Sequence, residues 1–275
     1  MTGITIIGAG RLGAALARGL RDALPDQRLL LVQRPGPIAE ARVHEGFEVV
    51  PRLPLDHRAR ALFVVVKPRD MSEVLDDVAA RVRPDVPLIS LASGMTLEAL
   101  GDRLGPEFSP YRARANVFVA HRRGTVLLAD RPRSRFDAEV EALLSLLGQV
   151  HRVSEADMVR LTWYSSSVPI VLVSQLVARS LESADPELGE GLAGIVLDGL
   201  EALVAELRRA GPSAALTAAA FRSLVEQVAT PGGMNHAALR QLDEAGVWAA
   251  LDQARDLYLA SESTATKTTA TKERA

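Results

Sequence analysis

Short, uninterrupted apolar runs alternate with amphipathic segments over the first 153 residues. Continuous apolar runs are typical of strands that are buried on both faces of a parallel sheet. Eight runs predict strands, at 3–8, 28–34, 47–50, 61–68, 86–92, 111–119, 124–129 and 149–153. Helical spacing of apolar and small residues predicts helices between them, at 11–23, 70–82, 96–104 and 135–148. The alternation predicts an α/β fold with a doubly wound, mostly parallel sheet.

Strand signals stop after Ser154, and the pattern becomes helical. Residues 168–181 are apolar nearly all round, and apolar positions at 192, 195, 196, 200, 203, 204 and 207 form one stripe. We predict a sheet domain at 1–153, an all-α domain at 154–260 and, from its low complexity, a disordered tail at 261–275. Such apolar helices need cover, so we expect a homodimer through the helical domain, or a higher homo-oligomer.

A glycine-rich turn links the first predicted strand to the first predicted helix. It reads Gly8-Ala9-Gly10-Arg11-Leu12-Gly13, the GxGxxG pattern in its expected context. Gly8 permits a tight turn, Gly10 lets a pyrophosphate approach the backbone, and Gly13 lets helix and strand pack closely. Backbone N–H groups at the helix start, among them those of Arg11 and Leu12, favour an anion. The turn predicts a Rossmann-type dinucleotide site.

The end of the second predicted strand indicates which dinucleotide binds. An NAD site usually places a carboxylate there for the ribose 2′-hydroxyl, but this strand ends in Gln33 and Arg34. A guanidinium pairs with a 2′-phosphate, whereas a carboxylate repels it. The sequence therefore favours NADP(H).

Composition narrows the other classes of function. The chain has no cysteine, and its five histidines are scattered without metal-ligand spacing, so we expect no metal site. The net charge of −2 gives no electrostatic footprint for nucleic acid. The N-terminus lacks the features of a signal peptide and no long uncharged apolar stretch occurs, so we expect a cytoplasmic protein without a membrane partner.

Several segments together resemble the pyrroline-5-carboxylate reductases. They are GAGRLGAALARGL, VVVKP, ISLASGMTLEAL, RARANVFVAHRRGTVLL, VSEADMVRLTWYSSSVP and VATPGGMNHAALRQLDEAGVWAAL, which span about residues 3–258 in the family's order. The resemblance implies an NADP-binding Rossmann domain, a helical dimerisation domain, and hydride transfer to a cyclic C=N bond. It also places Val66, Lys67, Pro68 and Asn116 beside the cofactor.

A Pro-Gly-Gly break at 231–233 precedes a short predicted helix. The glycines expose the backbone, so the first-turn N–H groups of that helix can hold an anionic or polar substrate. The resemblance agrees with this interpretation. Thr230, Gly232 and Gly233 are therefore candidate substrate-binding residues.

The chain departs from the family pattern where the substrate is expected. Ser166 and Val168 replace two glycines, Phe118 enters the loop after Asn116, and Met234-Asn235 follows Pro-Gly-Gly where the family has a threonine. We expect Asn235 to serve as an N-cap that still recognises the substrate. Candidate substrate contacts are Phe118, His121, Val168, Met234 and Asn235, and candidate proton donors are Tyr164, Ser167, His121 and Asn235.

These changes favour a bulkier or less carboxylate-dependent cyclic imine, in specialised metabolism, over pyrroline-5-carboxylate in proline synthesis. Two other functions stay open. A carbonyl-reducing dehydrogenase of this architecture would use a lysine as proton donor in the helical domain, but residues 155–255 contain none. A non-catalytic, NADP-responsive binding protein would keep the cofactor turn and lose the substrate site.

Overall fold

The computed structural model describes residues 3–182, 191–209, 218–229, 231 and 233–272. The chain divides into two compact units. The first contains residues 1–167 and 258–275, and the second contains residues 168–257.

The first unit is built on an eight-stranded sheet in the order β3-β2-β1-β4-β5-β6-β7-β8. The strands are β1 Ile4–Ile7, β2 Leu29–Val32, β3 Glu48–Val50, β4 Ala61–Val64, β5 Leu88–Ser90, β6 Pro110–Ala115, β7 Gly124–Ala129 and β8 Gly148–Val153. All neighbours pair in parallel except β6 and β7. The predicted doubly wound, mostly parallel sheet is confirmed.

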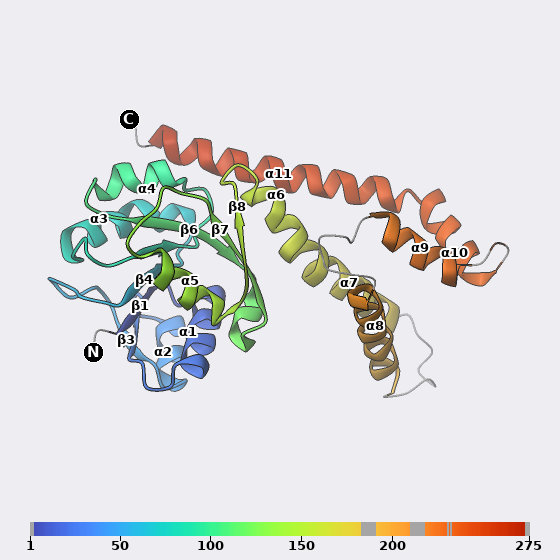
Figure 1. Ribbon diagram of the computed structural model, residues 1–275, viewed down its shortest axis with the longest axis horizontal. Coiled ribbons are helices and arrows are strands. Elements are labelled where there is room, and N and C mark those ends of the chain that lie inside the picture. The colour runs from blue at the N-terminus through green and yellow to red at the C-terminus, as the bar shows by residue number, and fades with distance from the viewer. Residues whose placement is uncertain (1–2, 183–190, 210–217, 230, 232, 273–275) are drawn as a thin grey trace. The chain divides into compact units, whose positions relative to one another are not determined.

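Helices cover both faces of this sheet (Figure 1). They are α1 Arg11–Ala23, α2 Pro37–His44, α3 Met71–Arg81, α4 Leu97–Leu104 and α5 Asp137–Ser145. One core joins α1 and α5 to strand residues such as Ile6, Phe63 and Ile89. The other joins α3 and α4 to alternate strand residues such as Leu62 and Leu88. Both sides of each central strand are therefore buried, which explains the uninterrupted apolar runs.

The region after β6 differs from the sequence prediction. The strand expected at 111–119 ends at Ala115, and the short 3₁₀-helix η2 Val117–His121 follows it. The Asn116 side chain accepts a hydrogen bond from Phe118 N at 3.2 Å, which caps η2. This local side-chain bond replaces further strand pairing.

Helix α1 and η2 approach each other closely at Gly19. A Cβ atom on Gly19 would lie 2.1 Å from the carbonyl oxygen of Val119. Val119 is itself fully buried in the first core. This contact fixes η2, and with it Phe118, to the helix that begins at the glycine-rich turn.

The sheet unit extends beyond the boundary predicted at residue 153. Helix α6 Met158–Thr162 packs on β7, with Met158 buried against Leu127 and Ala129. A π-helix, Trp163–Leu172, follows it. Trp163 also packs against Tyr258 in a tilted arrangement, with ring centroids 5.3 Å apart. Through these apolar contacts, the residues that precede the second unit in the sequence and those that follow it both belong to the first unit.

The second unit is all helical, as predicted. Its helices are α7 Val173–Glu182, α8 Leu192–Arg209, α9 Ala218–Val228 and α10 Met234–Glu244, together with the start of α11 Val247–Lys272. Helix α11 continues to Lys272, whereas low complexity predicted a disordered tail from residue 261. The run 247–272 contains neither glycine nor proline, so no residue interrupts the helix.

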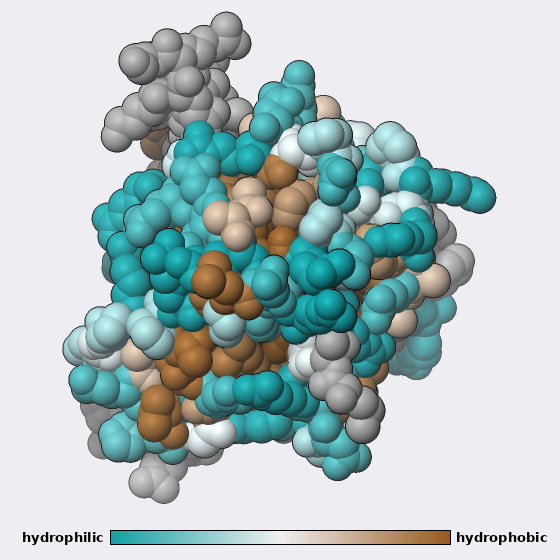
Figure 2. Space-filling view, turned by 90° about the vertical axis from the view of Figure 1, so that its left-hand side faces the viewer, coloured by the Kyte–Doolittle hydropathy of each residue, from teal (hydrophilic) through white to brown (hydrophobic). Residues whose placement is uncertain are grey.

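Burial differs sharply between the two units. Among the described residues of the second unit, Leu207 alone is counted in the buried core, while Leu176, Ile195 and Val228 are more than half exposed. Figure 2 shows a different surface, the left-hand side of Figure 1 where the sheet unit is labelled, and there apolar side chains lie in patches among hydrophilic ones. Apolar surface of this extent on a helical unit indicates an interface.

We predict that Gly19→Ala lowers the free energy of unfolding by about 1–3 kcal/mol, because the added methyl overlaps the Val119 carbonyl. Gly101→Ala is the matched control, since a Cβ there meets nothing within 4 Å and alanine favours helix. Urea denaturation of both variants measures the difference. Equal stabilities would show that α1 and η2 are not in close contact.

Candidate functional site: a dinucleotide cavity and the segment beside it

A cavity of about 710 Å³ opens where β1, β2 and β4 end. Its walls include Gly8 and Gly10 after β1, Gln33 and Arg34 after β2, and Val66 and Lys67 after β4. Strand β1 pairs with β2 on one side and with β4 on the other, so the strand order changes direction at β1. Ligands of doubly wound sheets bind at such a switch point, outside the carboxyl ends of the strands.

The three glycines of the turn have different roles. Gly8 has φ +94°, and a Cβ on Gly13 would lie 1.9 Å from the Gly8 carbonyl oxygen, so both are required for the fold. A Cβ on Gly10 would meet nothing within 4 Å. Gly10 is also the N-cap of α1 and makes no side-chain cap bond. The space beside Gly10 and the helix N-terminus therefore fits the pyrophosphate of a dinucleotide.

Gln33 supports the glycine-rich turn directly. Its Oε1 atom accepts a hydrogen bond from Ala9 N at 2.9 Å. A backbone N–H can only donate, so the oxygen of the Gln33 amide faces the turn. The NH₂ group of the same amide is then free of this bond and can donate to a ligand. A donor in this place suits a phosphate better than the ribose 2′-hydroxyl pattern of NAD sites.

Arg34 provides the positive charge predicted for a 2′-phosphate. Its side chain is 68 % exposed, and its Nη2 atom lies 3.0 Å from Asp70 Oδ1. Ion pairs with this much exposure contribute little. A phosphate can therefore replace Asp70 as the partner of the guanidinium.

Further charges line the same cavity. Arg52 donates to Asp77 at 2.7 Å, and Arg81 donates to the same carboxylate. Burial acts to raise the pKa of Asp77, but the hydrogen bonds from Arg52 and Arg81 outweigh it, and the pKa lies below its usual value. Asp77 thus stays ionised and holds the Arg52 side chain at the cavity.

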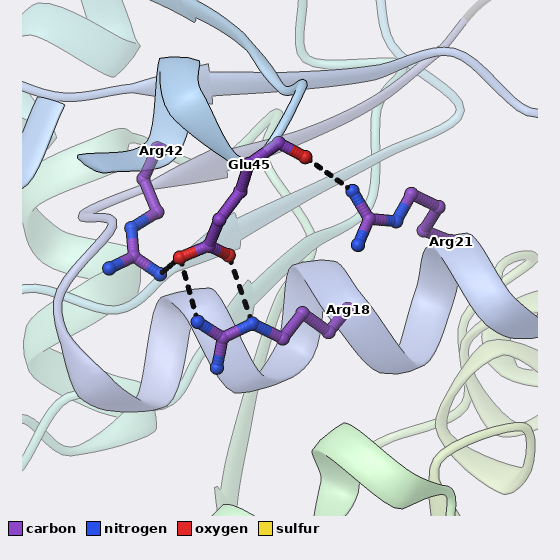
Figure 3. Close-up of polar contacts among 4 residues, drawn as sticks. All are labelled: Arg18, Arg21, Arg42 and Glu45. Atoms are coloured by element: carbon purple, nitrogen blue, oxygen red, sulfur yellow. Dashed lines mark hydrogen bonds and ion pairs between the residues drawn. The ribbon is translucent and has the colours of Figure 1, made fainter. Parts of the chain in front are cut away.

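A carboxylate joins the end of α2 to α1 (Figure 3). Glu45, which follows α2, binds Arg18 of α1 through both carboxylate oxygens at 2.8 and 2.9 Å. It also pairs with Arg42 at 2.6 Å, and its carbonyl accepts from Arg21 at 2.9 Å. The hydrogen bond from Arg18 is the largest cause that lowers the pKa of Glu45. These bonds anchor the segment that follows Arg34.

On the expected substrate side, the first unit holds Asn116, Phe118, His121, Tyr164 and Ser167. Asn116 is buried, and its Nδ2 donates to the Ser165 carbonyl at 3.1 Å. Phe118 and Tyr164 are 44 % and 53 % exposed, so both rings are accessible to a ligand. The roles of these residues in substrate binding and proton donation stay predictions.

The remaining substrate candidates belong to the second unit. Helix α10 has Gly233 as its N-cap, so the expectation that Asn235 is the N-cap is wrong. Asn235 lies in the first turn, where its Nδ2 donates to the Val228 carbonyl at 3.2 Å. Met234 is 90 % exposed, and Val168 lies within the π-helix. Thr230 and Gly232 lie outside the described residues.

The cavity thus brings together many of the predicted cofactor residues, namely Gly8, Gly10, Gln33, Arg34, Val66 and Lys67. Arg11, Leu12, Gly13, Pro68 and Asn116 lie outside its lining. Sequence reasoning missed Arg52, Arg69 and Asp70. The last two could have been found from their position directly after the strand-end Lys67-Pro68, whereas Arg52 reaches the cavity from a loop without a recognisable signal.

Comparison with known proteins agrees with this geometry. A family model described as "NADP oxidoreductase coenzyme F420-dependent" matches residues 3–94. The pyrroline-5-carboxylate reductase of Mycobacterium leprae is 29 % identical over 280 residues, covering 92 % of this chain and 93 % of that protein. The chain is therefore similar to the pyrroline-5-carboxylate reductases over most of its length.

Solved structures of these reductases share the fold. The Streptococcus pyogenes enzyme superposes with a TM-score of 0.78 at 20 % identity, covering 97 % of this chain and 98 % of that one. The Plasmodium falciparum enzyme, solved with NADP bound, gives 0.77 at 17 % identity, covering 96 % and 98 %. The resemblance drawn from sequence motifs is confirmed over 92 % of the chain by the sequence match, and these structures show that the fold is shared.

We predict that Arg34→Asp weakens NADPH binding by about 10- to 100-fold, the contribution of a charged hydrogen-bonded pair, and NADH binding by much less. Fluorescence titration of both cofactors measures this. Arg28→Asp, an exposed change at the start of β2 outside the cavity lining, is the matched control. Equal losses for the two cofactors with Arg34→Asp would contradict the 2′-phosphate assignment.

Proposed function

We propose that the protein is an NADPH-dependent reductase of a cyclic C=N bond, similar to the pyrroline-5-carboxylate reductases. The cavity at the ends of β1, β2 and β4 carries this proposal. It offers a helix N-terminus and an open glycine to a pyrophosphate, and the Gln33 amide and Arg34 guanidinium to a phosphate on the ribose. Similarity to the reductases over more than nine-tenths of the chain supports it.

The proposed reaction does not require the protein to form a covalent bond with the substrate. When bound, NADPH supplies a hydride, whose electron pair forms the new C–H bond as the C=N π electrons move onto nitrogen. A protonated imine carbon is already electrophilic, so orientation and binding provide most of the catalysis. Tyr164, Ser167, His121 and Asn235 are the residues we propose as proton donors where the imine arrives neutral.

We place substrate recognition at the start of α10. Its N-cap is a glycine without a side-chain cap bond, so the first-turn N–H groups can bind a carboxylate or another polar group. Asn235 uses its amide nitrogen on Val228, which leaves its oxygen as an acceptor for the substrate. The exposed Met234 of α10 and, in the first unit, the exposed Phe118 each favour a larger or less polar imine than pyrroline-5-carboxylate, in specialised metabolism, with proline synthesis as the alternative.

We also propose that the second unit dimerises with a second copy of this chain. Ile195, Leu203 and Val204 of the α8 stripe are 68 %, 43 % and 44 % exposed. By length and composition alone, the helical run Met158–Glu182 could cross a membrane. Its first residues are tied to the sheet unit through buried Met158 and the Ser165 carbonyl, so we assign its apolar surface to the protein partner and the protein to the cytoplasm.

Steady-state NADPH oxidation against pyrroline-5-carboxylate and a panel of cyclic imines without a carboxylate tests the activity. We expect turnover, with the higher kcat/KM on an imine other than pyrroline-5-carboxylate. Gly10→Val is the matched control: its side chain enters the open space of the cavity, so NADPH binding and turnover fall while stability is retained. Tight NADPH binding without turnover on any imine would favour the non-catalytic binding protein.

For the dimer, we predict that the double variant Ile195→Asp and Leu203→Asp is a monomer, because it places two charges on an apolar interface. Light scattering after size-exclusion chromatography measures the mass. Asp198→Lys, on the side of α8 opposite the centre of the stripe, is the control and is expected to stay dimeric. A monomeric native protein would overturn this assignment.

A further inference from the structure

We propose that Asn116 is a positioning residue that holds the Ser165–Ser167 segment of the π-helix, and that it does so by binding a carbonyl group that Pro169 prevents from bonding within an α-helix. This inference rests on the proposed function only where it concerns catalysis.

Both ends of the buried Asn116 amide are engaged. Oδ1 accepts from Phe118 N at 3.2 Å, and Nδ2 donates to the Ser165 carbonyl oxygen at 3.1 Å. A backbone N–H needs an acceptor and a carbonyl needs a donor, so the two bonds fix the orientation of the amide. One side chain thus links the η2 loop after β6 to the helix that carries the three serines.

Pro169 removes the α-helical partner of the Ser165 carbonyl. It lies four residues after Ser165, inside the π-helix Trp163–Leu172. In an α-helix, the N–H of residue 169 would bind the Ser165 carbonyl, but proline has no N–H and its ring crowds that carbonyl. The helix takes wider π-type turns here, a form that is common at functional sites. The Asn116 amide gives the Ser165 carbonyl a donor from outside the helix, at 3.1 Å.

This link positions candidate substrate-binding residues as well as bonding a carbonyl of the helix. Ser165, Ser166 and Ser167 follow one another in the π-helix, and Tyr164 precedes them with half of its surface exposed. At the other end of the amide, Phe118 opens η2 with an exposed ring. Asn116 therefore sets the distance between two sets of substrate-facing candidates within the first unit, without having to touch the substrate itself.

A double-mutant cycle between Asn116→Ala and Pro169→Ala tests this inference. In the native background, Asn116→Ala is expected to raise hydrogen–deuterium exchange across residues 162–168 by about tenfold, because the Ser165 carbonyl loses the donor that ties this segment to η2. In the Pro169→Ala background, position 169 regains a backbone N–H that can bind the Ser165 carbonyl, so the same change should alter exchange by about twofold or less. Equal effects in the two backgrounds would overturn the proposal.

The variant Asn116→Asp tests the donor and acceptor ends of the amide separately. It replaces the alanine variant if that variant does not fold. Its carboxylate can still accept from Phe118 N but cannot donate to Ser165, so exchange should rise over 162–168 and stay native over 117–121. Exchange that rises over both segments alike, or over neither, would count against the link. Neither exchange experiment depends on turnover.

Kinetics then decide whether the positioning matters for the reaction. With the imine found in the substrate panel, Asn116→Ala should lower kcat by about tenfold while the NADPH dissociation constant stays within about twofold, because misplaced groups cost rate rather than cofactor affinity. A variant with raised exchange and native kcat would remove the catalytic role. If no imine is reduced even by the native protein, the proposed function fails while the exchange cycle still decides the link.

Discussion

The first unit depends on the close packing of β1 against α1 at the glycine-rich turn. Gly13 sits so near the Gly8 carbonyl that a single added carbon would lie 1.9 Å from it, and a Cβ on Gly8 would lie 2.6 Å from the Val65 carbonyl oxygen. The helix can begin directly above the strand end only because both residues lack side chains. That placement directs the N-terminus of α1 into the cavity, where the third glycine leaves space for a ligand.

Two amide side chains then use their hydrogen-bonding capacity to fix two segments of the first unit, the glycine-rich turn and the start of the π-helix. Gln33 binds the Ala9 N–H of the turn, and Asn116 binds the Phe118 N–H and the Ser165 carbonyl. An amide can satisfy a donor and an acceptor at once, which no ionised carboxylate can do. These two segments are therefore held by neutral groups, and the exposed Arg34, which pairs with Asp70, stays available to a phosphate.

The second unit has the opposite character. Its helices expose the apolar stripes that the sequence predicts. Among its described residues, only the side chain of Leu207 is buried. A helical unit with so little internal core gains its stability from what covers it. In the dimer that we propose, a second copy of the chain would provide matching apolar stripes.

The sequence by itself determined the order of strands and helices, the dinucleotide turn and the relationship to the reductases. Those features follow from local patterns: continuous apolar runs, helical spacing and glycines where the backbone must approach a neighbour. Only the tertiary structure decided that Asp70 pairs with Arg34, that Gly233 rather than Asn235 caps α10, and that Asn116 reaches Ser165. These contacts join residues far apart in sequence or compete with equally good local bonds, and no local pattern records which partner is nearer once the chain is packed.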